Sequence, residues 1–418
     1  MGRHRGIAAR SLLMTVLLLT ACGTSSSPSQ SPTPPSAPTA PSGTWTALHP
    51  LGQGIYTQLE YAQCNGANDC WADGFREDST TSYVQFLEHW NGQGWSISSP
   101  TVTNANGPGY AEATPLGELD CLPSGLCVIP NSATTQVTID SVASGAWTQM
   151  PSDNPGTAAL PNSSANSVTC ISETLCLAVG NIVDATFTHA MAIGLVWDGT
   201  SWTSTVLPLV GADPVNDLIS VSCASQTLCF GVGVTSLGPH ASHHAMIAKW
   251  DGSTWSATTA PSGTSLVSII CVDPTFCLAA GWQGSSSLIL RWDGSTWTPE
   301  QMPPTGSLYT INCSSRDLCM ALQAPDPNKP LGTVPVALRW HGTWFKVTGY
   351  PAVAAKLSGV SCVDTGCMVV GWDRSTPSSG PNDIAGSRST AAMYTINGAS
   401  SSSSSTPSSG ASSPAASP

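Results

Sequence analysis

Closely spaced cysteine pairs recur seven times along the chain, six of them with five residues between the cysteines, and this repeat restricts the possible folds more than any other feature. The last pair is one residue closer than the others, and a tryptophan follows six of the pairs, commonly within Trp-Asp-Gly-x-x-Trp. Self-similarity at intervals of about 42 to 57 residues indicates a repeat architecture. The pairs are Cys64 and Cys70, Cys121 and Cys127, Cys170 and Cys176, Cys223 and Cys229, Cys271 and Cys277, Cys313 and Cys319, and Cys362 and Cys367, and the tryptophans are Trp95, Trp147, Trp202, Trp255, Trp297 and Trp344.

Each repeat has the pattern of four short strands. The first strand runs into the first cysteine and the second leaves from the second cysteine. The third and fourth flank Asp-Gly, a hairpin signal because glycine accepts a positive φ. The seventh repeat ends near Gly398 without a tryptophan, whereas Trp45 precedes the first pair. We therefore predict an all-β fold, a single seven-bladed β-propeller with four-stranded blades, whose ring is closed by the N-terminal strand joining the last blade.

The cysteine count agrees with this arrangement. Seven local pairs and Cys22 account for all fifteen cysteines. Because each pair lies across a short turn, the simplest connectivity is seven hairpin disulfides, which form in an oxidising compartment. Zinc sites and redox-active pairs favour shorter cysteine spacings. Seven repetitions of the same pair favour a structural role.

The first residues have the features of an export signal. Three arginines precede an apolar run from Leu12 to Leu19, too short to span a bilayer. The run ends in Leu19-Thr20-Ala21-Cys22, which resembles the lipobox of bacterial lipoproteins and implies lipidation of Cys22. We predict a signal peptide at 1–21, a lipidated Ser/Pro-rich tether at 22–42, the propeller at 43–398 and a disordered Ser/Pro/Ala tail at 399–418.

Composition excludes several classes of partner. The formal net charge is −12 and only 9% of residues are charged, so the chain cannot coat nucleic acid by neutralising phosphates. Sixteen acidic residues and one basic residue lie in 22–248, which predicts a strongly negative side. We expect a monomer attached to the extracytoplasmic face of the bacterial membrane by its lipid, with a cell-envelope glycan or protein as its partner and no nucleic acid.

The repeated Ser-Cys-x5-Cys and Trp-Asp-Gly-x-x-Trp resemble those of secreted or lipid-anchored propeller proteins from GC-rich Gram-positive bacteria. Trp-Asp-Gly-Ser-Thr-Trp is also similar to the Asp-box turn of sialidases, although here Asp and Gly are adjacent and the leading Ser is absent. Sialidase catalysis, in that resemblance, uses an arginine triad with Tyr, Glu and Asp. Arg291 and Arg339 instead precede equivalent turns, which indicates a structural strand position.

Variable loops on the face opposite the cysteine turns are the expected place for function. One candidate ligand-binding group is a histidine cluster whose imidazoles suit a transition metal, with a solvated polar loop as the alternative. The second is an acidic loop beside an aromatic, suited to sugars or cationic groups, or else a plain surface loop. The two groups comprise His189, His240, His243 and His244, and Asp73, Arg76, Glu77, Asp78 and Tyr83.

No common catalytic motif occurs in the chain. We assign no catalytic residue, metal or cofactor, and predict a lipid-anchored, non-catalytic binding or interaction module at the bacterial cell surface. The alternative is a carbohydrate-active enzyme, a sialidase-like glycoside hydrolase or lyase, which would require paired carboxylates converging near the central channel. A third interpretation is an envelope spacer without a ligand.

Overall fold

A computed structural model describes residues 42–51, 56–79, 82–99, 117–131, 137–153, 155–186, 188–210, 213–236, 243–323, 336–351, 355–374 and 387–396, all within the compact unit Ala40–Pro418. These residues form strands, turns and loops. Within the same ranges, no helix has the length and apolar composition needed to cross a membrane. Cys22, residues 1–21, nearly all of the predicted tether and the tail at 399–418 lie outside the described residues.

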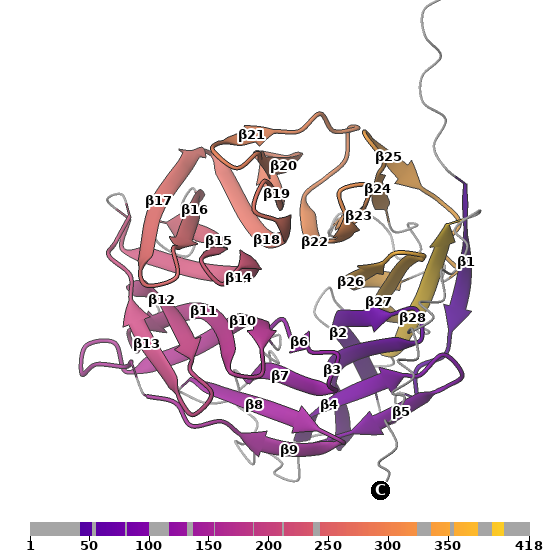
Figure 1. The fold of residues 1–418 in the computed structure, drawn as a ribbon, viewed down its shortest axis with the longest axis horizontal. Coiled ribbons are helices and arrows are strands. Elements are labelled where there is room, and N and C mark those ends of the chain that lie inside the picture. The colour runs from indigo at the N-terminus through magenta and orange to yellow at the C-terminus, as the bar shows by residue number, and fades with distance from the viewer. Residues whose placement is uncertain are drawn as a thin grey trace, which may run out of the picture. The chain divides into compact units, whose positions relative to one another are not determined.

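Most of the strands form four-stranded antiparallel sheets in which chain order and spatial order agree (Figure 1). The first sheet contains β2 (Tyr56–Gly66), β3 (Asp69–Ser79), β4 (Ser82–Trp90) and β5 (Trp95–Ser98). The second contains β6 (Asp120–Cys121), β7 (Leu126–Asn131), β8 (Thr138–Ala143) and β9 (Ala146–Gln149). Two later sheets contain β18 (Thr264–Asp273), β19 (Phe276–Gln283), β20 (Ser286–Trp292) and β21 (Trp297–Pro299), then β22 (Leu308–Ser315), β23 (Leu318–Gln323), β24 (Ala337–Trp340) and β25 (Trp344–Val347).

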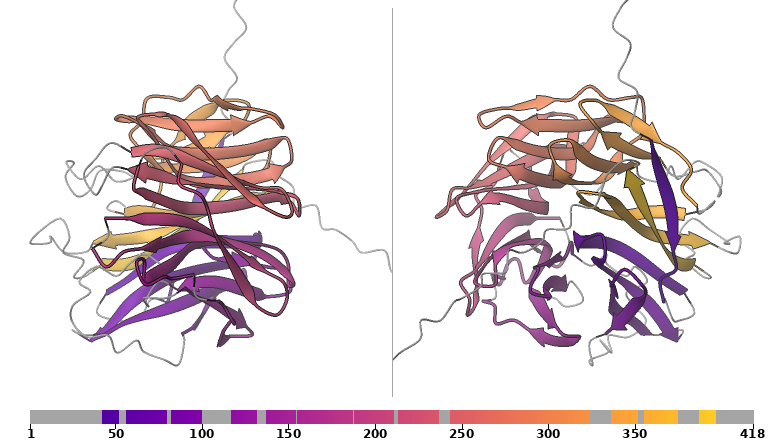
Figure 2. Two further views of the ribbon diagram at one scale, coloured as in Figure 1. Left: turned by 90° about the vertical axis from the view of Figure 1, so that its left-hand side faces the viewer. Right: turned by 45° about the vertical axis from the view of Figure 1, so that its right-hand side comes forward.

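Two further sets of four strands are joined into one sheet of eight by a single parallel bridge between Ala190 and Val215. One set is β10 (Asn162–Ser172), β11 (Leu175–Val183), β12 (Ala190–Trp197) and β13 (Trp202–Val206). The other is β14 (Val215–Ser225), β15 (Leu228–Ser236), β16 (His243–Trp250) and β17 (Trp255–Ser262). Successive sheets are layered face against face in the side views of Figure 2.

The N-terminal strand pairs with the C-terminal one, as the sequence predicts. β1 (Gly43–Leu48) lies antiparallel to β28 (Ser387–Ile396), in a sheet completed by β27 (Gly366–Arg374) and β26 (Ala355–Val363) (Figure 1). Trp45 packs against Tyr350 and Tyr394 with ring centroids 5.1 and 5.0 Å away, and its indole N–H donates to the carbonyl of Thr348 at 3.1 Å. The lone tryptophan before the first cysteine pair is therefore part of the last sheet.

All seven predicted disulfides are present, each across the turn between the first two strands of a sheet. The two cysteines of a pair are direct cross-strand partners, as in Cys223↔Cys229, so the bond fits the hairpin without displacing either strand. The local spacing of each pair thus follows from hairpin geometry. The bonds are Cys64–Cys70, Cys121–Cys127, Cys170–Cys176, Cys223–Cys229, Cys271–Cys277, Cys313–Cys319 and Cys362–Cys367.

The cysteines are also part of the apolar core, a feature that their spacing does not reveal. In every pair, the second cysteine is at most 1% exposed and belongs to a hydrophobic cluster, because it begins the strand that lies second in its sheet. In each disulfide, at least one of the two cysteines is therefore shielded from solvent. The buried second cysteines are Cys70, Cys127, Cys176, Cys229, Cys277, Cys319 and Cys367.

The Asp-Gly turns also form where the sequence predicts them. Trp250 and Trp255 face each other across the turn between β16 and β17, with ring centroids 5.6 Å apart. Gly252 has φ +97°, a conformation that favours glycine. Asp251 Oδ1 accepts hydrogen bonds from the main-chain N–H groups of Ser253 and Thr254, so the aspartate closes its own turn.

Neighbouring sheets are joined by a hydrogen bond that repeats with the cysteine pairs. We call the residue directly before the first cysteine of a sheet the acceptor position. Its side-chain oxygen accepts a hydrogen bond from the main-chain N–H of the first cysteine in another sheet. The bonds are Cys271 N–H to Ser222 Oγ (2.9 Å), Cys362 N–H to Asn312 Oδ1 (2.9 Å), Cys64 N–H to Ser361 Oγ (2.8 Å) and Cys170 N–H to Asp120 Oδ2 (2.6 Å).

A second repeated bond involves the residue three places before the first cysteine, here called the bulge position because it follows an extra residue in the strand. Serine hydroxyls at this position accept a main-chain N–H from the next sheet. The bonds are Val221 N–H to Ser167 Oγ (3.1 Å), Ile269 N–H to Ser220 Oγ (3.2 Å) and Ile311 N–H to Ser268 Oγ (3.1 Å). Between the sheets, clusters such as Phe230 and Val232 against Leu266 and Ile269 form the apolar core.

Candidate functional site

A cavity of about 300 Å³ is lined by residues of β2, β10, β14, β18 and β22, the first strands of their sheets, and by the segment around β6. Most lining residues lie at or beside the first cysteine of a repeat, so the same few sequence positions build its wall. Glu118 and Asp120 are the charged residues of this lining, which contains no lysine, arginine or histidine. The cavity is therefore polar and negatively charged.

Glu118 precedes β6 and reaches side chains of two other sheets. Its Oε2 accepts hydrogen bonds from the hydroxyls of Ser167 at 3.1 Å and Ser220 at 2.8 Å. Burial raises the pKa of the Glu118 carboxyl, and these two hydrogen bonds oppose that rise by favouring the ionised form. The carboxyl group thus links three sets of strands at one boundary of the cavity.

Asp120, in β6, occupies an acceptor position. Its Oδ2 accepts the Cys170 N–H, the same structural contact that serine or asparagine makes elsewhere. Burial raises the pKa of Asp120 to about 6, against the lowering effect of hydrogen bonds that include this one. Asp120 therefore changes charge near neutral pH while facing the cavity.

Two tyrosines and a further glutamate lie near Glu118. The hydroxyls of Tyr61 in β2 and Tyr309 in β22 are hydrogen-bonded to each other, and burial followed by the charge of Glu60 raises the pKa of Tyr309 to about 12. Glu60 is only 5% exposed, and burial raises its pKa against the attraction of the Lys356 ammonium. These side chains extend the polar group from β2 to β22 and β26.

Asp73 does not lie in a loop, which corrects one expectation from the sequence. It is a fully buried residue of β3, where its Oδ1 accepts the main-chain N–H of Tyr61 at 3.1 Å. Its Oδ2 has no hydrogen-bond partner. Burial, and next the charge of Glu60, raise the pKa of Asp73 well above its ordinary value. Asp73 therefore belongs with the buried acids rather than with a solvated surface.

The rest of the expected acidic loop is also strand. Arg76, Glu77 and Asp78 continue β3, and Tyr83 lies in β4 with its backbone opposite Glu77. The pairing of β3 with β4 extends through the segment expected to be a loop, with a shift of register between Glu77 and Ser79. The side chains of Glu77, Asp78 and Tyr83 lie outside the described residues.

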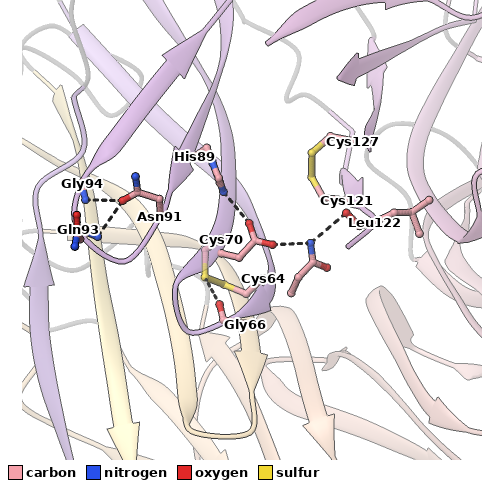
Figure 3. Close-up of polar contacts among 12 residues, drawn as sticks. Cys64, Gly66, Cys70, His89, Asn91, Gln93, Gly94, Cys121, Leu122 and Cys127 are labelled. Atoms are coloured by element: carbon pink, nitrogen blue, oxygen red, sulfur yellow. Dashed lines mark hydrogen bonds and ion pairs between the residues drawn. A yellow bond between two sulfur atoms is a disulfide. The ribbon is translucent and has the colours of Figure 1, made fainter. Parts of the chain in front are cut away.

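Close to the lining residue Asn65, a histidine stacks on a tryptophan. The rings of His89 and Trp71 lie 3.8 Å apart at 12°, and His89 Nε2 is 2.7 Å from Asp69 Oδ1. Asn65, a lining residue, donates from its amide to Asp69 Oδ2 and to the carbonyl of Leu122, each at 3.3 Å. Figure 3 shows His89 near the Cys64–Cys70 disulfide and Leu122 beside Cys121.

Two histidines of the predicted cluster each contact a carboxylate through Nδ1. His244 is 3.2 Å from Asp213 Oδ2, which also accepts the Thr235 hydroxyl at 2.6 Å, and His189 is 3.1 Å from Asp184 Oδ2. His189 precedes β12, whereas His244 lies in β16, and β14 and β15 separate these strands in the sheet. The structure thus places the two imidazoles on strands that are not neighbours.

The remaining members of that cluster are His240, which lies outside the described residues, and His243, whose side chain does. Among the residues that are described, no group of three or more histidine, cysteine, aspartate or glutamate side chains is placed to hold a metal ion.

Glu118, Asp120, Glu60, Tyr61 and Tyr309 are not among the residues predicted from the sequence. A signal for the first two was available in the repeat. At the bulge position, Ser167, Ser220 and Ser268 are matched by Glu118 in the second repeat, and at the acceptor position Ser222, Asn312 and Ser361 are matched by Asp120. A comparison of the repeats position by position, rather than a search for loop clusters, identifies both acids.

No protein-family model and no curated protein matches the chain. Solved structures share its fold. A catalytically inactive variant of virginiamycin B lyase from Staphylococcus aureus, with quinupristin, is similar over 85% of this chain and 100% of that one, at 10% identity and a TM-score of 0.57. Polysaccharide lyase Uly1 is similar over 84% of this chain and 92% of its own, at 8% identity and a TM-score of 0.53. The WD40 repeats of RRP9 are similar over 84% of this chain and 97% of their own, at 9% identity and a TM-score of 0.51.

The fold is a β-propeller. The β-propellers similar to this chain include two lyases and a set of WD40 repeats, so the fold by itself does not choose between catalysis and binding. At these low identities the likeness concerns architecture alone. The cavity and the buried groups around it are therefore the features that bear on function.

Proposed function

We propose that the chain is a lipid-anchored, extracytoplasmic β-propeller that acts as a non-catalytic binding module at the bacterial cell surface, with its ligand in the cavity between the first strands. The observation that carries the proposal is this cavity of about 300 Å³, in which side chains from several sheets converge on two carboxyl groups. Concave, largely preformed sites with a few converging polar groups are typical of ligand binding.

The proposed architecture is seven blades in a closed ring. The five four-stranded sheets and the two halves of the eight-stranded sheet supply the blades. The hydrogen bond from the Cys64 N–H to Ser361 Oγ joins the first and last sheets in the same way that neighbouring sheets are joined. In addition, Ser358 Oγ donates a hydrogen bond to the Leu59 carbonyl at 2.7 Å. These contacts support closure, with the N-terminal strand completing the last blade.

The proposed location rests on the lipobox at Cys22 and on the hairpin disulfides. Disulfides persist in oxidising compartments outside the cytoplasm. Radiolabelled palmitate incorporation tests the anchor: the wild-type protein should carry the label, and Cys22→Ala should not.

The binding proposal is tested by filling the cavity. Gln63 lines it and is partly exposed, so Gln63→Trp should block the ligand with little effect on folding. Gln149→Trp is the matched control, because Gln149 lines a separate hollow of about 230 Å³ beside β8 and β9. The full-length proteins are incubated with cell-envelope extract, and retained material is identified by mass spectrometry. Retention by the wild type and Gln149→Trp, but not by Gln63→Trp, is expected; equal retention by all three would contradict the proposal.

A second candidate function is a carbohydrate-active enzyme. It is favoured by three carboxyl groups whose pKa is raised by burial, those of Glu60, Asp73 and Glu118, close to Tyr61. Perturbed acids of this kind gather at catalytic sites. New glycan fragments that form with the wild type and are lost in Asp73→Asn would favour the enzyme. Recovery of intact ligand with no new fragment would favour the binding module.

A further inference from the structure

The repeats of this chain provide an internal comparison for Asp120. At the acceptor position, Ser222, Asn312 and Ser361 receive the cysteine N–H with neutral oxygens. Asp120 makes the same contact with a carboxylate, although burial disfavours its ionised form. The contact between sheets does not require the charge, since neutral side chains form it elsewhere in the same molecule.

The same comparison applies to Glu118. In three other repeats the bulge position carries a neutral serine, whereas Glu118 places a carboxyl group between the hydroxyls of Ser167 and Ser220. A glutamine carbonyl oxygen is also able to accept both hydroxyl hydrogens. The two hydrogen bonds therefore explain an acceptor at this site but not a negative charge.

The negative charge around the cavity has little compensation. The lining contains no basic residue, and Lys356 is the cation that acts on nearby Glu60. Asp73, fully buried and within the field of Glu60 and Glu118, has an oxygen with no hydrogen-bond partner. Buried carboxylates without a counter-charge are strongly unfavourable, and an occupant carrying positive charge would stabilise them.

We propose that Glu118 and Asp120 bind the cationic group of the ligand, an ammonium or a guanidinium, inside this cavity. The inference rests on the proposed binding function and adds the chemistry of the ligand. Charge-assisted hydrogen bonds from N–H groups to carboxylates are short and strong, and they gain strength where water is excluded. The amides of Asn65 and Asn312, which also line the cavity, are available to a polar remainder of the same ligand.

The test uses agmatine, which carries both an ammonium and a guanidinium, as the probe and 1,4-butanediol as its uncharged counterpart. Binding to the full-length protein is measured by titration calorimetry at pH 7.5. Glu118→Gln and Asp120→Asn keep an acceptor at each site and remove the charge. Asp217→Asn is the matched control. Asp217 lies in β14, and burial also raises its pKa to about 6, but it does not line the cavity.

Agmatine should bind saturably to the wild type and to Asp217→Asn, and at least tenfold more weakly to Glu118→Gln and to Asp120→Asn. 1,4-Butanediol should not compete. Unchanged thermal unfolding of the two cavity variants would show that weaker binding comes from the lost charge and not from a damaged fold.

Three results would overturn the inference: no saturable agmatine binding, equal agmatine affinity in the charge-neutral variants, or displacement of agmatine by calcium chloride at lower concentration than by a second amine. The envelope-extract experiment separates this failure from failure of the binding function. If Glu118→Gln retains the envelope ligand while Gln63→Trp loses it, the cavity binds a ligand whose recognition is not cationic. If Gln63→Trp also retains it, both proposals fail.

Discussion

The main-chain N–H of Cys64 in β2 donates a 2.8 Å hydrogen bond to the hydroxyl of Ser361 in β26, a residue 297 positions later in the chain. Both residues are buried, so neither group can turn to water if the other is removed. The bond between Cys271 and Ser222 has the same form. The first and last sheets are therefore joined by the same kind of hydrogen bond that joins sheets adjacent in sequence.

Removing the Ser361 hydroxyl should destabilise the protein. Ser361→Ala leaves the buried Cys64 N–H without an acceptor, which costs about 1–3 kcal/mol of unfolding free energy. Urea unfolding followed by tryptophan fluorescence measures the loss. Ser222→Ala, which removes the matching bond to Cys271, should lose a similar amount; a neutral Ser361→Ala beside a destabilised Ser222→Ala would show that the contact between the first and last sheets is not maintained in solution.

Removing one disulfide should weaken the fold without abolishing it. The Cys223→Ser/Cys229→Ser double variant opens a loop of only seven residues, which lowers the unfolding free energy by about 2 kcal/mol on the chain-entropy model. Thermal unfolding gives the change, and peptide mapping under non-reducing conditions checks that the other six pairs stay bonded. Collapse of the whole domain from this one change would contradict the view that each disulfide acts locally.

Aspartates at the outer turns should protect the fold against acid. Hydrogen bonds from the Thr200 hydroxyl and from the N–H groups of Ser201 and Thr200 lower the pKa of Asp198 to about 2. Because the folded-state pKa lies below the ordinary value of 3.8, this stabilisation is complete above about pH 4 and is lost as the pH falls through about 2.

Asp198→Ala should therefore lower the melting temperature at pH 6 and make less difference at pH 2. Asp198→Asn should lie between Asp198→Ala and the wild type at pH 6, since its neutral amide oxygen can accept the two main-chain contacts that Asn91 accepts in the β4–β5 turn. Differential scanning calorimetry at the two pH values separates these outcomes. A pH-independent effect of Asp198→Ala would show that the carboxylate charge has no part in it.

Asp217, in β14, should give stability the opposite dependence on pH. Burial raises its pKa to about 6, although the amides of Asn181 and Asn166 donate to it at 2.7 and 3.0 Å. The folded state then holds the proton more tightly than the unfolded chain, so stability falls as the pH rises from about 4 to about 6 and stays lower above that. The loss is at most roughly 3 kcal/mol.

Asp217→Asn should remove this loss. The variant is expected to match the wild type at pH 4 and to exceed it in unfolding free energy at pH 7.5. Guanidinium unfolding at both pH values measures the difference. A variant that is less stable than the wild type at pH 7.5 would show that the ionised carboxylate is needed by its two asparagine partners.

The sequence predicts the hairpin disulfides, the Asp-Gly turns and the four-stranded sheets because its signals are local and repeated. Each disulfide lies within one hairpin, and each Asp-Gly turn is set by glycine at a positive φ and by the aspartate beside it. Pairing of the strand at Trp45 with the last repeat followed from one missing tryptophan and one extra. None of these inferences required knowledge of distant contacts.

The burial of the second cysteines was not evident from their spacing. A hairpin disulfide can lie at the surface or in the core. The packing of one sheet on the next determines whether its sulfur atoms are buried. Cys277, for example, lies in a cluster with Phe230 and Val232 of β15, and such a cluster forms only when neighbouring sheets come together.

The candidate site was less accessible to sequence analysis. Glu118 meets Ser220, 102 residues away, only because the fold brings the first strands of different sheets together. Asp73 was assigned to a loop because acids cluster after it, yet β3 continues through that cluster. Acidic residues in a regular, buried strand contradict the usual hydrophobic pattern, and such local exceptions are what a functional site imposes on its sequence.

The pairing of β1 with β28 has a consequence for the order in which the molecule is completed. β1 is among the first parts of the domain to be synthesised, and its partner is the last strand of the chain. At about 10 residues per second, the interval between them is on the order of half a minute. During that time Trp45 has none of its aromatic neighbours, and the edge of β1 is open to other chains.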